Sequence, residues 1–400
     1  MLRNALFLAT RSLLWYRGRV TIIVLCLAVT ICVPLTVRAL VREFQSEILV
    51  RAHATPLIVG NRGSRIDLVL HGLYFQSAAP ESVSMAEVKY IEESGYASAI
   101  PLHIQFRTQD VGQTDGVPIV GTTLEYLEFR DLQIDDGQPL ARLGDCLLGA
   151  RFAARTGLQP GDRLLSAPSN AFNLAGDYPL NMRVAGILSP GFSPDDDAVF
   201  VDIKTAWIIQ GIGHGHQALS KDSGNQLLET AADGPLTANA SVLPYTQITD
   251  ENESSFHFHG DVSSFPVSEV LAVPHDRQSQ TLLLGRYASV RRDRAQCVKP
   301  ITVVDELLAM VFRIEQLFRV AALLSGIVTA VLLGLIIFLT VRLRAPEMST
   351  MQRIGSARGT TALLVGCEVC IMLFVAAGIA AIGARLSASL ASDQLRHWLF

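Results

Sequence analysis

Residues 320–341 read VAALLSGIVTAVLLGLIIFLTV, which is a stretch of 22 residues without a charged side chain. A helix needs about 20 apolar residues to cross the hydrocarbon core of a bilayer, so this stretch predicts a membrane-spanning helix. Residues 20–37 (VTIIVLCLAVTICVPLTV) also lack charge, and residues 359–384 contain one charged side chain, Glu368. Both stretches are long enough to span as well. We therefore predict an integral membrane protein with three visible transmembrane helices.

The composition of the whole chain agrees with this prediction. Of its 400 residues, 50% are hydrophobic and 18% are charged, and the mean hydropathy is +0.33. The formal net charge of −4 provides no basic surface for the phosphate backbone of DNA or RNA, so nucleic-acid binding has no support.

Positive charge beside the spans predicts the orientation of the chain. Short segments rich in Lys and Arg stay in the cytoplasm. Two segments have this character, before the first span and after the second, with Arg3, Arg11, Arg17, Arg19, Arg342, Arg344, Arg353 and Arg358. The N-terminus is therefore predicted inside and residues 41–316 outside, with the end of the chain outside as well. Arg38 and Arg42 oppose this orientation without reversing it.

The first apolar stretch could instead be a cleaved signal peptide. Such peptides have a shorter apolar core and end in a small-x-small cleavage site. Residues 20–37 exceed that length, and no such site follows before Arg38. We therefore interpret the stretch as an uncleaved anchor.

The spans divide the chain into segments. We expect a cytoplasmic interfacial helix at 1–18, transmembrane helices at 19–41, 319–341 and 359–385, an extracytoplasmic domain at 42–303, a stalk helix at 304–318, a cytoplasmic coupling loop at 342–358 and an extracytoplasmic tail at 386–400. Residues 1–18 could equally be an extension of the first span.

The outer segment has a mixed α and β pattern. Ser84 and Glu87 have the spacing of a capping box, which predicts a helix to about Ser94. Between residues 211 and 260 the composition shifts to Gly, Ser, Asn, Asp and His, which predicts a loop-rich insertion. Strands are expected at 99–107, 117–120, 182–188, 198–201, 268–273 and 295–303, and helices at 148–156, 278–287 and 304–318. The fold class is therefore an α+β membrane protein with a mixed α/β domain inserted between the first and second transmembrane helices.

Histidines are concentrated in one part of this domain. Five of the nine lie between residues 214 and 275, and four of these form two His-x-His pairs, His214 with His216 and His257 with His259. Side chains two residues apart on a strand share one face, so each pair can offer two imidazoles to one ion. Together the pairs could hold zinc or a similar metal, with the carboxylates of Asp261 and Asp276 as further groups. The alternative is that they are ordinary surface residues.

Other candidate sites have weaker support. Cys146 and Cys297 lie in the outer segment, where they could form a disulfide. Cys367 and Cys370 have the spacing of a redox or zinc motif, but they lie in an apolar span, where thiols behave as small hydrophobic groups. The run of aspartates at 195–197 lacks the spacing of a calcium loop and is interpreted as a solvated turn. No motif that pairs a nucleophile with a base indicates a hydrolase.

Three parts of the sequence carry a family resemblance. They are residues 116–121 (GVPIVG) with 132–137 (LQIDDG), residues 148–162 (LGARFAARTGLQPGD) with 184–187 (VAGI) and 197–201 (DAVFV), and residues 344–358 (RAPEMSTMQRIGSAR). With the order of spans and outer domain, they resemble the MacB/FtsX/LolC-type permeases of ABC transport systems. Members of that family usually have four spans, so this chain either uses three or has been shortened.

The resemblance implies a separate ABC ATPase subunit that binds ATP, and a homodimer or heterodimer with a second permease. The chain contains no Gly-x-x-x-x-Gly-Lys-Ser/Thr motif, so it is not itself expected to be the ATPase. Within the coupling loop, Pro346 can start a helix and Gly355 can end it. This helix is expected to present Glu347, Met351, Gln352, Arg353 and Arg358 to the ATPase. The alternative is that the arginines there simply fix the topology.

Glu368 lies inside the third apolar stretch, where a charged group is costly and by default suggests an ion path. Its position near the inner end favours a structural role, in which a neighbouring helix or headgroup water satisfies it.

We therefore predict a non-catalytic, multi-pass permease subunit of the bacterial plasma (inner) membrane, with a periplasmic domain. The resemblance implies that ATP hydrolysis in the partner moves the outer domain by mechanotransmission. The domain would then export or release a lipoprotein, peptide, lipid or small molecule, and a periplasmic partner or substrate would bind to it. Two alternatives stay open: a membrane-anchored metal-binding or sensor protein, and an FtsX-like regulator of cell-envelope hydrolases.

Overall fold

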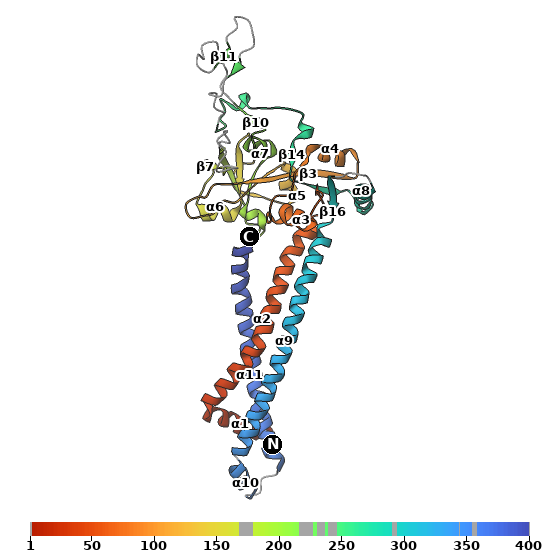
Figure 1. The fold of residues 1–400 in the computed structure, drawn as a ribbon. Coiled ribbons are helices and arrows are strands. Elements are labelled where there is room, and N and C mark those ends of the chain that lie inside the picture. Colours follow the sequence, from red (N-terminus) through yellow and green to blue (C-terminus); the bar gives the residue numbers. More distant parts are fainter. Residues whose placement is uncertain are drawn as a thin grey trace. The chain divides into compact units, whose positions relative to one another are not determined.

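The computed structural model describes residues 2–167, 179–215, 227–229, 237–238, 246–289, 294–343, 345–353 and 358–399 (Figure 1). The chain forms two compact units, one of Met1–Leu49 with Asp305–Leu399 and the other of Val50–Val304. The first unit is helical, and the second is built around a β-sheet.

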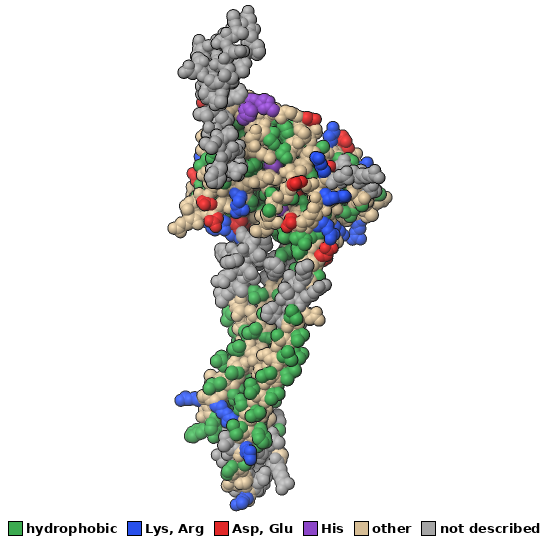
Figure 2. All heavy atoms as spheres, in the orientation of Figure 1, with side chains coloured by type: hydrophobic (Ala, Val, Ile, Leu, Met, Phe, Trp, Pro, Cys, Tyr) green, Lys and Arg blue, Asp and Glu red, His purple; other side chains and the backbone are tan. Residues whose placement is uncertain are grey.

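The helical unit contains three helices that are long and apolar enough to cross a membrane. Its elements are α1 (Leu2–Trp15), the first part of α2 (Arg17–Ala54), most of α9 (Pro300–Leu343), α10 (Ala345–Arg353) and α11 (Arg358–Leu399). The apolar windows are Arg17–Val41, Val320–Leu339 and Leu363–Ser387. Figure 2 shows hydrophobic side chains over much of the outer surface of these helices.

Small side chains allow α2 and α11 to pack closely. Ala28 of α2 and Ala376 of α11 are both buried in one hydrophobic cluster. A Cβ on Gly383 would lie 3.2 Å from the sulfur of Cys32, so a larger residue at that position would crowd α2. Without a hydrophobic driving force between helices in lipid, such close contact supplies much of the association energy.

The α/β unit is built on a ten-stranded sheet with the strand order β16-β1-β15-β3-β4-β9-β6-β8-β5, in which β7 pairs with β8. Most neighbouring strands are antiparallel, and β4 with β9 and β6 with β8 are parallel. The strands are β1 (Leu57–Asn61), β3 (Ala97–Arg107), β4 (Pro118–Thr122), β5 (Ile134–Gly137), β6 (Asp145–Leu148), β7 (Arg163–Leu165), β8 (Asn181–Leu188), β9 (Val199–Asp202), β15 (Glu269–Pro274) and β16 (Ala295–Val298).

Shorter elements surround this sheet. The helices are α3 (Arg65–Tyr74), α4 (Met85–Glu93), α5 (Leu124–Phe129), α6 (Ala150–Thr156), α7 (Ile203–Ile209) and α8 (Arg277–Ser289). Three two-stranded ribbons pair β2 (Val83–Ser84) with β14 (Pro266–Val267), β10 (Gly213–His214) with β13 (His257–Phe258), and β11 (Leu227–Glu229) with β12 (Thr237–Ala238).

Helix α7 contributes to both hydrophobic cores of this unit. Trp207 packs with residues of α4, α8 and β15 in one core, which we call the first core. Ala206 and Ile208 pack with residues of α6, β6, β8 and β9 in the second core. Because adjacent positions of one short helix enter different cores, α7 links the two halves of the sheet.

A buried ion pair holds the last turn of α2 within the α/β unit. The guanidinium of Arg51 donates to both carboxylate oxygens of Asp195, at 2.5 and 2.9 Å. The hydroxyl of Tyr126 donates to the same carboxylate at 2.9 Å, and the Tyr126 ring stacks on Phe200 of β9. Burial is the largest influence on Asp195 and would raise its pKa, but the charge and hydrogen bonds of Arg51 together with further groups hold that pKa below its ordinary value.

The prediction of a solvated turn at the three aspartates is therefore wrong. They form the 3-10 helix η1 (Pro194–Asp197), and all three are buried. The chain tolerates this because arginines compensate the charges: Arg51 pairs with Asp195, and Arg151 reaches Asp196 and Asp197.

Most predicted elements are confirmed within one to three residues, including α4 after Ser84, and α8. The Ser84 side chain, however, does not make the hydrogen bond to α4 that a capping box requires. The strand expected at 295–303 is partly wrong, because β16 ends at Val298 and α9 begins at Pro300. Proline fits the first turn of a helix since its fixed φ is helical and its missing N–H has no partner there anyway. Tyr16 separates α1 from α2, and α11 continues to Leu399 through the residues expected as a tail.

The cysteines of the α/β unit are free. Cys146 belongs to the second core, whereas Cys297 packs against the first, so the disulfide considered from the sequence is not formed. Cys367 and Cys370 in α11 are also free.

We expect Asp195→Ala to lower the free energy of unfolding of the α/β unit by about 3–5 kcal/mol, because it leaves the buried Arg51 without its counter-charge. Urea unfolding of the detergent-solubilised chain measures this through the fluorescence of Trp207, with Trp15 and Trp398 replaced by phenylalanine.

The matched control is Glu93→Ala, which removes an exposed i,i+4 pair with Lys89. This change should cost at most about 0.5 kcal/mol. Equal effects of the two variants would show that the Arg51 pair has no special weight.

Candidate functional site

The residues predicted to contact an ATPase lie in and next to α10. Glu347, Met351, Gln352 and Arg353 belong to this helix, and Arg358 is the first residue of α11. The Arg353 side chain is exposed, whereas the side chains of the other four lie outside the described part of the structure, as does Gly355.

Two hydroxyl groups make hydrogen bonds to the backbone in the first turn of α10. Ser349 and Thr350 both donate to the backbone carbonyl of Pro346, at 2.7 and 3.0 Å. Arg353 lies in the last turn of α10, so its positive charge is near the negative end of the helix dipole and stabilises the helix. The helix is therefore a short, separately formed element that presents an exposed arginine.

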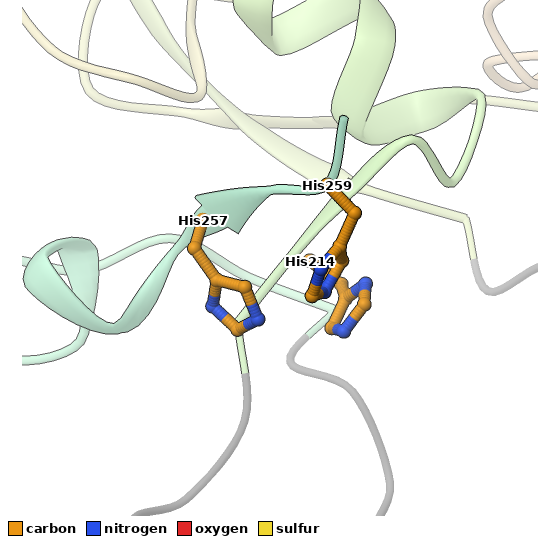
Figure 3. A group of neighbouring side chains, drawn as sticks. All are labelled: His214, His257 and His259. Atoms are coloured by element: carbon orange, nitrogen blue, oxygen red, sulfur yellow. The ribbon is translucent and has the colours of Figure 1, made fainter. Parts of the chain in front are cut away.

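A second candidate site is the histidine cluster, which consists of His214, His257 and His259. One nitrogen of each imidazole lies within 4.8 Å of the corresponding nitrogens of the other two. The ring centroids are 4.8–5.0 Å apart, and the three rings lie on one side of the ribbon formed by β10 and β13 (Figure 3). Of the four histidines predicted from the sequence, the structure thus brings three together, and His216 lies outside the described residues.

The pairing of β10 with β13 explains why the three histidines meet. His214 lies directly opposite His257 in the antiparallel register. His259 is two residues further on, so the period of two along extended chain places it on the same side as His257. The ring of His214 therefore has a neighbour in register and a second one on the diagonal.

The other side of this ribbon is aromatic. Phe258 packs against both hydrophobic cores, and Phe256 packs against the second. A Cβ on Gly213 would lie 2.5 Å from the Phe258 ring, and a Cβ on Gly215 would lie 2.6 Å from the Phe256 ring. Glycine at these two positions makes room for the aromatic rings, and this packing turns His214 to the opposite side.

A backbone contact orients one of the imidazoles. Nδ1 of His257 lies 2.9 Å from the carbonyl oxygen of Ser255. A carbonyl only accepts, so this contact requires the proton on Nδ1 and makes Nε2 the nitrogen with the lone pair. The side chains of His214 and His257 are partly buried and that of His259 is exposed, so the cluster is reachable from solvent.

The two aspartates considered as further ligands have other roles. Asp261 caps the N-terminus of a short 3-10 helix (Val262–Ser264). Its carboxylate accepts hydrogen bonds from the backbone N–H and the hydroxyl of Ser263. Asp276 accepts from the backbone N–H of Ser279 in the first turn of α8. These hydrogen bonds lower the pKa of both carboxyl groups. Neither aspartate belongs to the cluster of potential ligands.

Glu368 of α11 is buried within the helical unit, at 8% exposure. It lines a cavity together with Tyr16, Arg19 and Val341. A cation at the cavity wall is consistent with a structural role for this glutamate, since buried carboxylates need compensation.

A group of buried ionisable residues in α3, β3 and β15 was not predicted from the sequence. Nδ1 of His71 in α3 lies 2.5 Å from a carboxylate oxygen of Glu269 in β15, and both residues are buried. Burial raises the pKa of Glu269, and His71 counteracts this. Nearby, His103 of β3 is fully buried, and burial lowers its pKa to about 4. The available signal was the position of both histidines inside otherwise apolar stretches.

Residues 20–241, more than half of the chain, match the family described as MacB-like periplasmic core domain. Among solved structures, the periplasmic region of MacB from Actinobacillus actinomycetemcomitans is similar at 12% identity, covering 65% of this chain and 97% of that one with a TM-score of 0.35. The extracellular domain of the noncanonic ABC-type transporter YknZ from Gram-positive bacteria is similar at 10% identity, covering 60% and 98% with a TM-score of 0.33. Comparison with curated proteins gives no match.

The low pKa of His103 predicts acid sensitivity of the α/β unit. The folded chain favours the neutral imidazole of His103, whereas the unfolded chain takes up a proton below about pH 6.5. The free energy of unfolding is therefore highest above about pH 6.5 and falls as the pH decreases from there toward 4. The lowering of the His103 pKa from 6.5 to about 4 corresponds to a loss of about 3 kcal/mol in the free energy of unfolding. We expect His103→Leu to lose less stability than the wild-type chain over this pH range, measured as the urea midpoint at each pH.

Asp195 is not expected to contribute to this difference, because its lowered pKa places its effect below about pH 4. Parallel pH profiles of the wild-type chain and His103→Leu would contradict the assignment.

Proposed function

Because this chain belongs to the family with a MacB-like periplasmic core domain, we propose that it is the permease subunit of an ABC transport complex. The observation that carries this proposal is the family match over residues 20–241, which includes the apolar part of α2 and much of the α/β unit. Two further helices of membrane-spanning length follow in α9 and α11, as a multi-pass subunit requires.

The charges beside the apolar helices support one orientation. Arginines cluster before the first helix and between the second and third, which favours a cytoplasmic location for α1 and α10. The α/β unit is then extracytoplasmic, on the periplasmic side in a bacterium with two membranes. We therefore propose the plasma (inner) membrane as its location.

Helix α10 is the proposed contact for a separate ATPase. It is preformed, it exposes Arg353, and it lies in the chain between two helices of membrane-spanning length. Closure of an ATPase dimer against this helix would displace the ends of α9 and α11. Helix α9 is continuous from Pro300 to Leu343, so an uninterrupted helix connects the proposed membrane segment to the α/β unit.

A second permease is the proposed partner within the membrane. The described side chains of α9 between residues 320 and 339 are all exposed or half-buried, and most are large and apolar. This surface is available to lipid or to the corresponding helices of a homologous or identical subunit. The complex would use its outer domains to export or release a lipoprotein, peptide, lipid or small molecule.

One observation favours a different function. The histidine cluster lies on the α/β unit, so it would fit a membrane-anchored metal-binding or sensor protein that needs no ATPase. Purification in mild detergent separates the two functions, because a permease subunit retains a stoichiometric ABC ATPase that mass spectrometry identifies.

We expect Arg353→Glu to reduce retention of the ATPase about tenfold or more, since like charges placed in an interface cost at least ~1.4 kcal/mol. The measurement compares ATPase recovered per permease, and ATP hydrolysis, between wild-type and variant complexes of equal membrane content.

The matched control is Arg385→Glu, which reverses an exposed arginine near the other end of the third apolar helix. It should retain the ATPase. Loss with Arg385→Glu and not with Arg353→Glu would reverse the proposed orientation, and a preparation without any ATPase would contradict the permease function.

A further inference from the structure

We propose that His214, His257 and His259 form a binding site for a divalent transition-metal ion of the Zn²⁺ class, with three imidazole nitrogens as ligands and a fourth position open. This inference is independent of the permease function, because it rests on the geometry of the β10–β13 ribbon alone.

The spacing of the imidazoles suits one ion. Zn–N bonds of about 2.0–2.1 Å in a tetrahedral site place ligand nitrogens about 3.4 Å apart. The three nitrogens are already within 4.8 Å of one another, so small rotations of the side chains close the remaining gap. His259 is exposed, which leaves its ring free to make that adjustment without moving the core.

The fold holds the ligands in place. His214 lies between two glycines, Gly213 and Gly215. The rings of Phe258 and Phe256 occupy the space that a side chain at these two positions would need. Since Phe258 packs on Trp207 at 6.3 Å and on Phe265 at 6.1 Å between ring centroids, the ribbon is anchored to the first core through its aromatic side. Ordinary surface histidines do not need such a support, whereas a metal site depends on ligands with a restricted orientation.

The outer-shell contact of His257 supports the same assignment. Metal-binding histidines commonly donate their second ring N–H to a backbone carbonyl or carboxylate, which fixes the tautomer and raises the basicity of the ligating nitrogen. Nδ1 of His257 has this relation to the Ser255 carbonyl at 2.9 Å. Nε2 is then the ligand atom.

The ligand set selects the type of ion. Imidazole nitrogens suit Zn²⁺, Cu²⁺ and Ni²⁺, whereas Ca²⁺ and Mg²⁺ require oxygen ligands. Three protein ligands are typical of sites that keep a fourth position for water or an outside ligand. A bound ion would also join β10 to β13 and thereby link the two ends of the loop-rich insertion.

The test uses the full chain in detergent, purified through a tag without histidine and stripped of metal with a chelator. Calorimetric titration with Zn²⁺ should give one ion per chain, and Co²⁺ should give the visible absorption of a tetrahedral site. X-ray absorption on the zinc form should detect three imidazole nitrogens at about 2.0–2.1 Å.

We expect His214→Ala, His257→Ala and His259→Ala each to raise the Kd for Zn²⁺ by about 10–100-fold or more. Loss of an outer-shell group alone has an effect of this size, and these variants each lose a direct ligand. His275→Ala is the matched control, because His275 is exposed and lies outside the cluster. It should bind Zn²⁺ as the wild-type chain does.

At one fixed Zn²⁺ concentration, Zn²⁺ should also raise the urea midpoint of the wild-type chain and of His275→Ala, and raise that of His259→Ala by much less. The exposed position of His259 makes this variant the one that keeps the fold, which Trp207 fluorescence verifies. Absence of saturable Zn²⁺ binding in the wild-type chain would overturn the proposal, and so would equal affinity in all four alanine variants.

Discussion

A guanidinium enclosed in a protein interior must have its charge compensated at that place. The carboxylate of Asp195 compensates Arg51, and the Tyr126 hydroxyl accepts a hydrogen bond from Arg51 and donates one to Asp195. This constraint connects parts of the α/β unit that are distant in sequence. The end of α2 is tied to η1, η1 leads into the central strand β9, and Tyr126 stacks on the same strand through Phe200. One carboxylate therefore holds the last turn of α2 to η1 and, through η1, to β9.

The α/β unit is connected differently to the helix that precedes it, α2, and to the helix that follows it, α9. At the N-terminal end, a long helix is fixed by the ion pair of Arg51. At the C-terminal end, β16 lies at the edge of the sheet beside β1, and α9 starts two residues later. The edge strand β16 makes its strand hydrogen bonds to one neighbour, β1, whereas the last turn of α2 is fixed by a buried ion pair.

Local sequence patterns predicted much of this architecture. The apolar stretches, the capping box at Ser84 and the alternation of residues 182–188 identify elements because the signal lies within each element. The aspartates at 195–197 were misjudged since their partner Arg51 is 144 residues away from Asp195, and charge in sequence normally indicates solvent. Similarly, the two His-x-His pairs were visible, but the pairing that brings His214 opposite His257 depends on packing of Phe256 and Phe258, which no local pattern reveals.

The two free thiols of the α/β unit have a consequence for where this domain can fold. Cys146 is fully buried, and burial raises its pKa; Cys297 is half-buried, and burial raises its pKa to about 12. The thiolate is the nucleophile that reacts with oxidants and attacks disulfides, so these residues are protected once the fold has formed. The domain needs no thiol oxidase to mature and gains nothing from one, and it should reach the same structure in a reducing compartment as in an oxidising one.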